Sequence, residues 1–281
     1  MLEKIQLPSG LAGAIWRNRF RGYIHAMHRH AELEINLVVQ GTARYILDDR
    51  QYLLGPASIV WLFPGQEHVL LEQSPDFEMW IVVFRPQLVR EVAREPGNII
   101  LREDKPAGSF CRYLPGESAA WLGSLCAQVT GIADDAQLHA AGLRLILRWA
   151  WRAFCSATRN EGRTLHPAVE QAVRLIKTTH GAASLELLGQ KVGISPARLS
   201  RLFKSQVGTP LVRFCQQQRL EYFLELYRRQ GLAGGGQVKM MQLALRAGFG
   251  SYPQFHRVFK AQMGMKPGDY AAAQRCGGGA G

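Results

Sequence analysis

A duplicated segment in the C-terminal half is the feature that most constrains the fold of this chain. Residues 195–208, SPARLSRLFKSQVG, recur 56 residues later as residues 251–264, SYPQFHRVFKAQMG, with six of fourteen positions identical. The apolar positions match as well, in the pairs Leu199/Phe255, Leu202/Val258 and Val207/Met263. Two copies are too few for a solenoid, which needs about three or more. The repeat therefore indicates a duplicated supersecondary unit.

Both copies have the same order of local signals. A short amphipathic helix is expected at residues 185–192 and again at about residues 238–247, and a glycine-containing turn follows each. Ser195 and Ser251 then occupy the N-cap position of a basic helix that ends at a glycine. A helix, a short turn and a basic second helix predict a helix-turn-helix motif in each copy.

The second helix of such a motif enters the major groove of DNA. Arginine pairs with guanine and glutamine with adenine, whereas a lysine one turn later more naturally reaches a phosphate. The candidate DNA-binding residues are Ser195, Ala197, Arg198, Ser200, Arg201 and Lys204 in the first copy, and Ser251, Tyr252, Gln254, His256, Arg257 and Lys260 in the second.

The charge distribution favours the same interpretation. The formal net charge is +12, and residues 165–281 hold 16 Lys and Arg against 5 Asp and Glu, whereas residues 1–164 hold 18 against 17. A basic half of this kind predicts a polyanionic partner, for which nucleic acid is the leading candidate. An anionic membrane surface and a merely solvated basic face are the alternatives.

The N-terminal half has the pattern of a β structure. Runs at residues 34–39, 44–47, 58–63 and 79–84 are rich in β-branched and aromatic residues and are separated by turn signals. Short strands at about ten-residue spacing predict an antiparallel barrel or sandwich. Residues 94–117 are interrupted by Pro and Gly and are expected to form loop with one possible strand.

From Glu117 the apolar spacing becomes that of helices, with a division near residues 131–135. The predicted class is α+β, with an antiparallel barrel resembling a jelly roll, a helical segment and an all-α C-terminal domain. The expected domains are a sensor at residues 1–116, a helical dimerisation segment at 117–155, a linker at 156–164, a DNA-binding domain at 165–273 and a disordered tail at 274–281.

The strings GISPARLSRLFKSQVGTP and ALRAGFGSYPQFHRVFKAQMGMKPGDY resemble the two halves of the AraC/XylS-type DNA-binding domain, over about residues 165–272. The resemblance implies two helical lobes joined by a long helix at residues 210–229, with both recognition helices in successive major grooves. Residues 231–237, GLAGGGQ, lengthen the connection beyond the family pattern. Ala197 is small for a base-reading position, and Pro253 lies within the second recognition turn.

Histidines mark a second candidate site in the N-terminal half. The spacing from Gly22 through His28, His30 and Glu34 to Gly41 matches the first cupin motif, and a looser second motif ends at His68. His28 and His30 alternate on one strand and point the same way. With Glu34 and His68 they could hold a divalent transition metal. They could equally be structural, or bind an organic effector.

A cupin-like barrel also predicts a ligand pocket, because a small barrel can hold one small ligand. Aromatic walls and polar histidines suit a sugar or another polar metabolite. The candidate effector-binding residues are His28, His30, Glu34, Tyr45, Trp61, His68 and Trp80.

These observations predict a bacterial transcription regulator that binds promoter DNA in response to a small molecule, and no enzyme activity. RNA polymerase is a partner if it activates, and a homodimer is expected, with Leu122, Leu125, Leu143 and Leu147 on the seam. Scattered cysteines, no long apolar run and no signal peptide predict a cytoplasmic protein without membrane contact. A metal-dependent cupin enzyme fused to a DNA-binding domain is the alternative.

Overall fold

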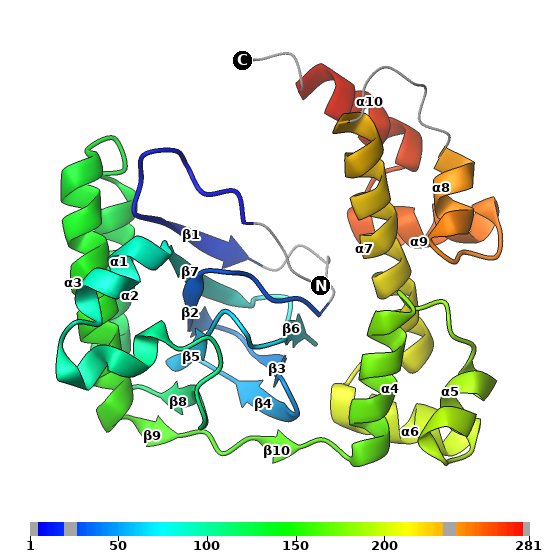
Figure 1. Cartoon of the computed structure of the whole chain (residues 1–281), viewed down its shortest axis with the longest axis horizontal. Helices are drawn as coiled ribbons and strands as arrows, with labels where there is room; N and C mark the ends of the chain where they lie inside the picture. Colours follow the sequence, from blue (N-terminus) through cyan, green and yellow to red (C-terminus); the bar gives the residue numbers. More distant parts are fainter. Residues whose placement is uncertain (1–4, 20–26, 233–239, 278–281) are drawn as a thin grey trace. The chain divides into compact units, whose positions relative to one another are not determined.

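The computed structural model describes residues 5–19, 27–232 and 240–277 (Figure 1). The chain folds into two compact units, one of strands and helices that ends at Thr164 and one of helices that begins at Leu165. No helix in these described ranges combines the length and the apolar character needed to cross a membrane.

The strands of the first unit form two antiparallel sheets, as expected for a jelly-roll-like fold. The six-stranded sheet has the order β1 (Gly13–Arg19), β7 (Glu78–Phe84), β2 (Leu33–Gln40), β5 (Ser58–Leu62), β8 (Cys111–Tyr113) and β9 (Thr158–Arg159). The four-stranded sheet has the order β10 (Arg163–Thr164), β4 (Arg50–Leu54), β3 (Ala43–Leu47) and β6 (His68–Leu71).

The six-stranded sheet is buried on both faces. One face meets the second sheet, and the other is covered by helices α2 (Gly116–Thr130) and α3 (Ala136–Ser156), of which α2 contacts β1, β2 and β7 (Figure 1). All five residues of β5 are buried for this reason. Residues in register on neighbouring strands share a face, so the pairing fixes which side chains point inward and which point to the helices.

The helical segment differs from expectation in what it buries. Leu122, Leu143 and Leu147 are fully buried in the core of their own unit, and Leu125 packs against that core. The amphipathic stripe of α2 and α3 therefore covers the unit's own sheet, and these leucines are not available as a dimer seam.

Four further elements differ from the sequence-based expectation. A helix, α1 (Pro86–Val92), follows β7, and a 3-10 helix, η1 (Pro96–Arg102), lies within the segment expected to be loop. The linker at residues 156–164 contains β9 and β10, which add one short strand to each sheet. Each of these two strands pairs with its neighbour through two residues. In the β8–β9 pair, Arg112 is opposite Arg159.

The second unit consists of helices. They are α4 (Pro167–Thr178), α5 (Leu185–Val192), α6 (Pro196–Val207), α7 (Leu211–Leu232), α8 (Met240–Arg246), α9 (Tyr252–Met263) and α10 (Pro267–Gly277). The pairs α5–α6 and α8–α9 form the two motifs that the repeat predicts. Pro253 lies in the first turn of α9, where proline is tolerated.

The long helix α7 joins the two motifs, as the family resemblance implied. Its 22 residues correspond to a length of about 33 Å. The glycine-rich connection at residues 233–237 lies outside the described residues, as do residues 278–281. The helix α10 continues to Gly277, so residues 274–277 are helical where a disordered tail was expected.

Candidate functional site

The recognition helix of the first motif, α6, presents a basic face to solvent. Leu199, Phe203 and Val207 are buried beneath it. Arg201 is exposed, and α6 contains no Asp or Glu that could neutralise it. Of the other residues expected to bind DNA, Ala197, Arg198 and Lys204 are exposed as well, and Ser200 is partly exposed.

The recognition helix of the second motif, α9, follows the same plan with fewer charges. Phe255, Val258 and Phe259 form its buried side. Arg257 and Lys260 are exposed, and no acidic residue lies on the helix. Two aromatic candidates, Tyr252 and His256, are partly exposed, with ring centroids 6.3 Å apart.

Three of the expected DNA-binding residues also cap the recognition helices. Ser195 Oγ accepts a hydrogen bond from the Arg198 backbone N–H at 3.4 Å, and Ser251 Oγ accepts one from the Gln254 N–H at 3.3 Å. The Gln254 side chain in turn accepts a hydrogen bond from the Gly250 N–H at 2.9 Å. A serine followed three residues later by glutamine is a capping-box pattern, so the sequence contained this signal.

We expect Gln254→Ala to lower the free energy of unfolding of the second unit by about 1 kcal/mol, because a capping interaction is lost. Glutamate keeps the acceptor of the capping box but adds a negative charge facing a polyanion. Gln254→Glu should therefore leave urea unfolding nearly unchanged while it weakens DNA binding. Equal DNA affinities of the glutamate variant and the wild type would show that this side chain lies away from DNA.

The histidines of the cupin motif come together in the first unit. The ring centroids are 4.4 Å apart for His28 and His68, 5.1 Å for His30 and His68, and 6.2 Å for His28 and His30. The Tyr45 ring stacks on His68 at 6.2 Å. The structure thus gathers four of the expected effector-binding residues, and Glu34 lies beside His30.

A buried polar row extends from this cluster along β2. His30 Nε2 lies 3.2 Å from Glu34 Oε2, and Asn36 Nδ2 donates a hydrogen bond to Glu34 Oε1 at 2.9 Å. Burial lowers the pKa of His30, but the Glu34 carboxylate, helped by Glu32, outweighs it and raises the pKa above its ordinary value. The row therefore places an imidazole and a carboxylate in contact where both are shielded from water.

The same row leaves one acceptor without a partner. Asn36 is fully buried, and its Oδ1 has no hydrogen-bond partner among the described residues. The neighbouring Glu34 carboxylate requires the NH₂ group on its own side, which fixes Oδ1 on the other. A buried acceptor of this kind calls for a donor from a bound molecule or water.

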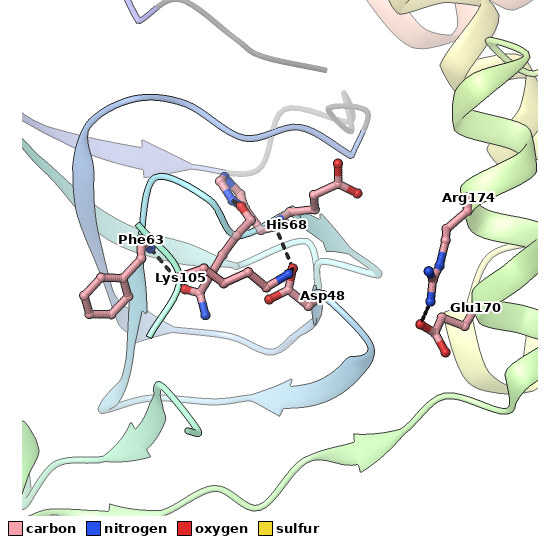
Figure 2. A network of polar contacts seen from close by, with 8 residues as sticks. Asp48, Phe63, His68, Lys105, Glu170 and Arg174 are labelled. Carbon is pink, nitrogen blue, oxygen red and sulfur yellow. Dashed lines mark hydrogen bonds and ion pairs between the residues drawn. The ribbon is translucent and has the colours of Figure 1, made fainter. Parts of the chain in front are cut away.

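A polar network holds the strand that carries His68 (Figure 2). Asp48 accepts a hydrogen bond from the Glu67 N–H at 3.1 Å and pairs with Lys105 Nζ at 3.0 Å. The Phe63 N–H donates to the Gln66 side chain at 3.1 Å, and the Gln66 carbonyl lies 3.2 Å from His68 Nδ1. These contacts orient the imidazole toward the cluster.

The structure shows how the four expected metal ligands lie relative to one another. In the described part of the chain, no group of three or more His, Cys, Asp or Glu side chains is placed to hold one metal ion. His30 Nε2, the nitrogen that would bind a metal, lies instead against Glu34. The four expected ligands are thus neighbours, and His30 lies in contact with Glu34.

Two expected pocket residues lie on the other face of the sheet. Trp61 is in register with Ile35, and its ring meets Trp151 of α3 at 5.1 Å. Trp80 lies beside Gly123 of α2. Both therefore face the helices, and neither joins the histidines.

Trp16 was not among the expected pocket residues, yet its side chain lies on the inner face of the sheet. Trp16 on β1 is in register with Ile81, which is in register with Asn36, so its side chain is on the same face as the polar row. Trp16 is 38% exposed. A half-exposed tryptophan on the inner face could contact a ligand.

Comparison with known proteins gives matches over both units. An AraC-like ligand binding domain matches residues 12–146, and a helix-turn-helix domain matches residues 188–273. The chain is 23% identical over 267 residues to YfiF of Bacillus subtilis (strain 168), named an uncharacterized HTH-type transcriptional regulator; the match covers 90% of this chain and 81% of YfiF.

Solved structures give weaker matches. ToxT from Vibrio cholerae O395 is 16% identical, with 92% of this chain and 95% of that chain covered and a TM-score of 0.38. The AraC-like transcriptional activator CuxR is 17% identical, with 68% and 67% covered and a TM-score of 0.34.

Proposed function

Because the chain belongs to the AraC family of ligand-responsive DNA-binding transcription regulators, we propose that α6 and α9 read promoter DNA and that the inner polar cluster of the first unit binds the effector. The observation that carries this proposal is the pair of capped basic helices, each with a buried apolar side and an exposed side free of acidic residues.

The helix between the motifs supports binding by both lobes at once. Successive major grooves on one face of DNA are about 34–36 Å apart. The 22 residues of α7 span about 33 Å. A rigid helix of this length suits two recognition helices that enter neighbouring grooves.

Selection of duplexes from a random pool by the full-length chain tests the proposal. We expect enrichment of a two-part sequence whose halves lie about 10 base pairs apart, centre to centre. A basic surface that only attracts phosphates would retain DNA without enriching any sequence, and that result would contradict the proposal.

The effector proposed for the first unit is a small polar molecule with hydrogen-bond donors. The unpaired Asn36 Oδ1 and the Glu34 carboxylate favour hydroxyl or amino groups, and Trp16 offers a flat apolar surface. A sugar or a related polar metabolite has this chemistry.

We expect the purified chain to contain much less than one equivalent of metal, since His30 pairs with Glu34 instead of leaving its nitrogen free for an ion. Elemental analysis of the wild type and of His28→Ala/His30→Ala, both without a His tag, measures this. About one equivalent in the wild type and none in the variant would contradict the expectation. That result would also support the alternative of a metal-dependent enzyme. Our own proposal is that the chain has no catalytic activity.

We propose a homodimer that uses the outer surface of α2 and α3. Trp121, Leu138 and Leu145 are 43%, 53% and 48% exposed, and the Trp121 and Trp149 rings meet at 4.4 Å. Asp134 and the N-cap Asp135 lie just before the first residue of α3, and Arg148 and Arg152 lie in its C-terminal half. Antiparallel pairing of two copies would therefore place unlike charges opposite each other.

Leu145→Glu should convert this dimer to a monomer, because it places a charge at the centre of α3's exposed apolar surface. Sedimentation velocity measures the change, with Leu187→Glu as the matched control, since Leu187 is similarly exposed on α5 of the other unit. A dimer that persists in Leu145→Glu, or a wild type that is already monomeric, would contradict the proposed surface.

On promoter DNA the dimer would act on transcription, either by contacting RNA polymerase as an activator or by blocking it as a repressor. We propose that the protein acts in the bacterial cytoplasm, where promoter DNA and RNA polymerase are present.

A further inference from the structure

A hollow of about 270 Å³ lies outside the inner polar cluster, at the C-terminal end of α3. Phe110, Trp151 and Phe154 form its apolar lining. Their rings are nearly parallel: Trp151 and Phe154 are 5.4 Å apart at 18°, and Phe110 and Phe154 are 6.3 Å apart at 11°. These stacked rings, with the Arg112 guanidinium 4.4 Å from the Phe154 ring centroid, give the hollow an aromatic side against which a planar apolar group could pack.

Two arginines share the same hollow. Arg112 on β8 and Arg159 on β9 are directly opposite each other in the antiparallel pair, so they lie on one face of the sheet. Like charges at such positions destabilise strand pairing. No carboxylate of the described residues pairs with either guanidinium, and no acidic side chain lines the hollow.

Only some of the hydrogen-bond donors of the Arg112 guanidinium have partners. Its Nη1 donates hydrogen bonds to the backbone carbonyls of Phe154 and Cys155, both at 2.8 Å, at the end of α3 where a cation is favoured. Its Nε is buried and has no hydrogen-bond partner among the described residues. Arg159 is exposed and makes no such contact with the helix.

Two arginines of α3, unlike Arg112 and Arg159, have carboxylate partners. Arg144 pairs with Glu91 at 2.8 Å, and Arg148 pairs with Glu95 at 2.9 Å. The groove beside α3 that contains both pairs is therefore electrically balanced, whereas the hollow with Arg112 and Arg159 has no acidic residue in its lining.

We propose that this hollow binds a small aromatic carboxylate, with its ring against the aromatic lining and its carboxylate between the two guanidiniums. Arginine forms strong paired hydrogen bonds with carboxylates. Ligand pockets usually measure about 300–1,000 Å³, so this volume limits the ligand to about one ring.

Such a ligand would join β8 to β9. The strand β9 leads through β10 directly to Leu165, where the second unit begins. Binding would therefore fix the connecting segment in place, at a site separate from the inner polar cluster. The inference does not depend on the function proposed for that cluster.

Calorimetric titration of the full-length chain with benzoate tests the proposal. Benzamide, which has the ring without the charge, and inorganic phosphate, which has the charge without the ring, are the comparison probes. We expect saturable binding of one benzoate per chain, at least tenfold weaker binding of both comparison probes, and at least a tenfold loss of benzoate affinity in Arg159→Gln. Arg163→Gln, which removes an exposed charge from β10, is the matched control and should bind benzoate as the wild type does.

Several results would overturn the proposal. These are no benzoate binding to the wild type, equal benzoate affinity in the wild type and Arg159→Gln, and phosphate binding as tightly as benzoate. Loss of benzoate binding in Glu34→Gln with no change in Arg159→Gln would place the ligand in the inner cluster instead. The Arg159 side chain makes no contact that holds the fold, and its replacement relieves the repulsion with Arg112, so its variants should unfold at or above the wild-type temperature. Arg159→Glu should abolish binding altogether.

Discussion

Replacement of both Arg201 and Arg257 by alanine should weaken binding to the selected DNA sequence by about 2–6 kcal/mol. Each arginine that reads a base contributes about 1–3 kcal/mol, and the two effects should add because the residues lie in separate motifs. Both side chains are exposed at the centre of a recognition helix. Fluorescence anisotropy with labelled duplexes would show the loss as at least about a 30-fold rise in Kd.

Random DNA and a lysine variant provide the controls for that experiment. The arginine variant should bind random duplexes almost as the wild type does, whereas Lys204→Ala/Lys260→Ala should weaken binding to both kinds of DNA. A plot of log affinity against log salt concentration should become less steep by about 1 for each phosphate contact that is lost. Equal losses on selected and random DNA in the arginine variant would mean that these arginines contact only phosphates.

Phe255→Ala should lower the free energy of unfolding of the second unit by about 3–5 kcal/mol, as expected when a buried phenylalanine leaves a cavity. Phe255 is fully buried, and its ring lies 4.4 Å from Phe223 of α7 and 5.5 Å from Phe259. It thus joins the long helix to the second recognition helix. Urea unfolding followed by circular dichroism measures the loss.

The matched control is Met241→Ala on α8, where the side chain is 56% exposed and the change should cost less than about 0.5 kcal/mol. In Phe255→Ala the second motif should be lost first, so sequence selectivity should fall more than affinity for random DNA. A Phe255→Ala protein with wild-type stability would show that the aromatic cluster around α9 is not the core of that lobe.

The helix-turn-helix motifs could be predicted closely because their signals are local. Ser195 and Ser251 cap their helices as expected, and α5 begins and ends at the residues that the apolar spacing indicates. A cap, a glycine in the left-handed region and an apolar stripe each depend on a few neighbouring residues. Only the second role of Gln254 was missed, although its spacing from Ser251 carried the signal.

The ligand pocket could be predicted only in part, because its walls depend on which face of a sheet turns inward. The strands β5 and β7 are apolar at every position after the first, so their sequences do not alternate, and Trp61 and Trp80 could face either way. Only the packing of α2 and α3 decides that both face the helices. The leucines expected on a dimer seam were misplaced for the same reason. They do form an apolar stripe on α2 and α3, but this stripe covers the unit's own sheet.

Moving one half of the selected DNA sequence by about 5 base pairs tests the central claim most directly, because it turns that half to the opposite side of the duplex. If α6 and α9 enter neighbouring grooves from one face, the affinity of the full-length chain should fall to that of a site with one half destroyed. An unchanged affinity would contradict the account, since it would mean that the two motifs do not read DNA together.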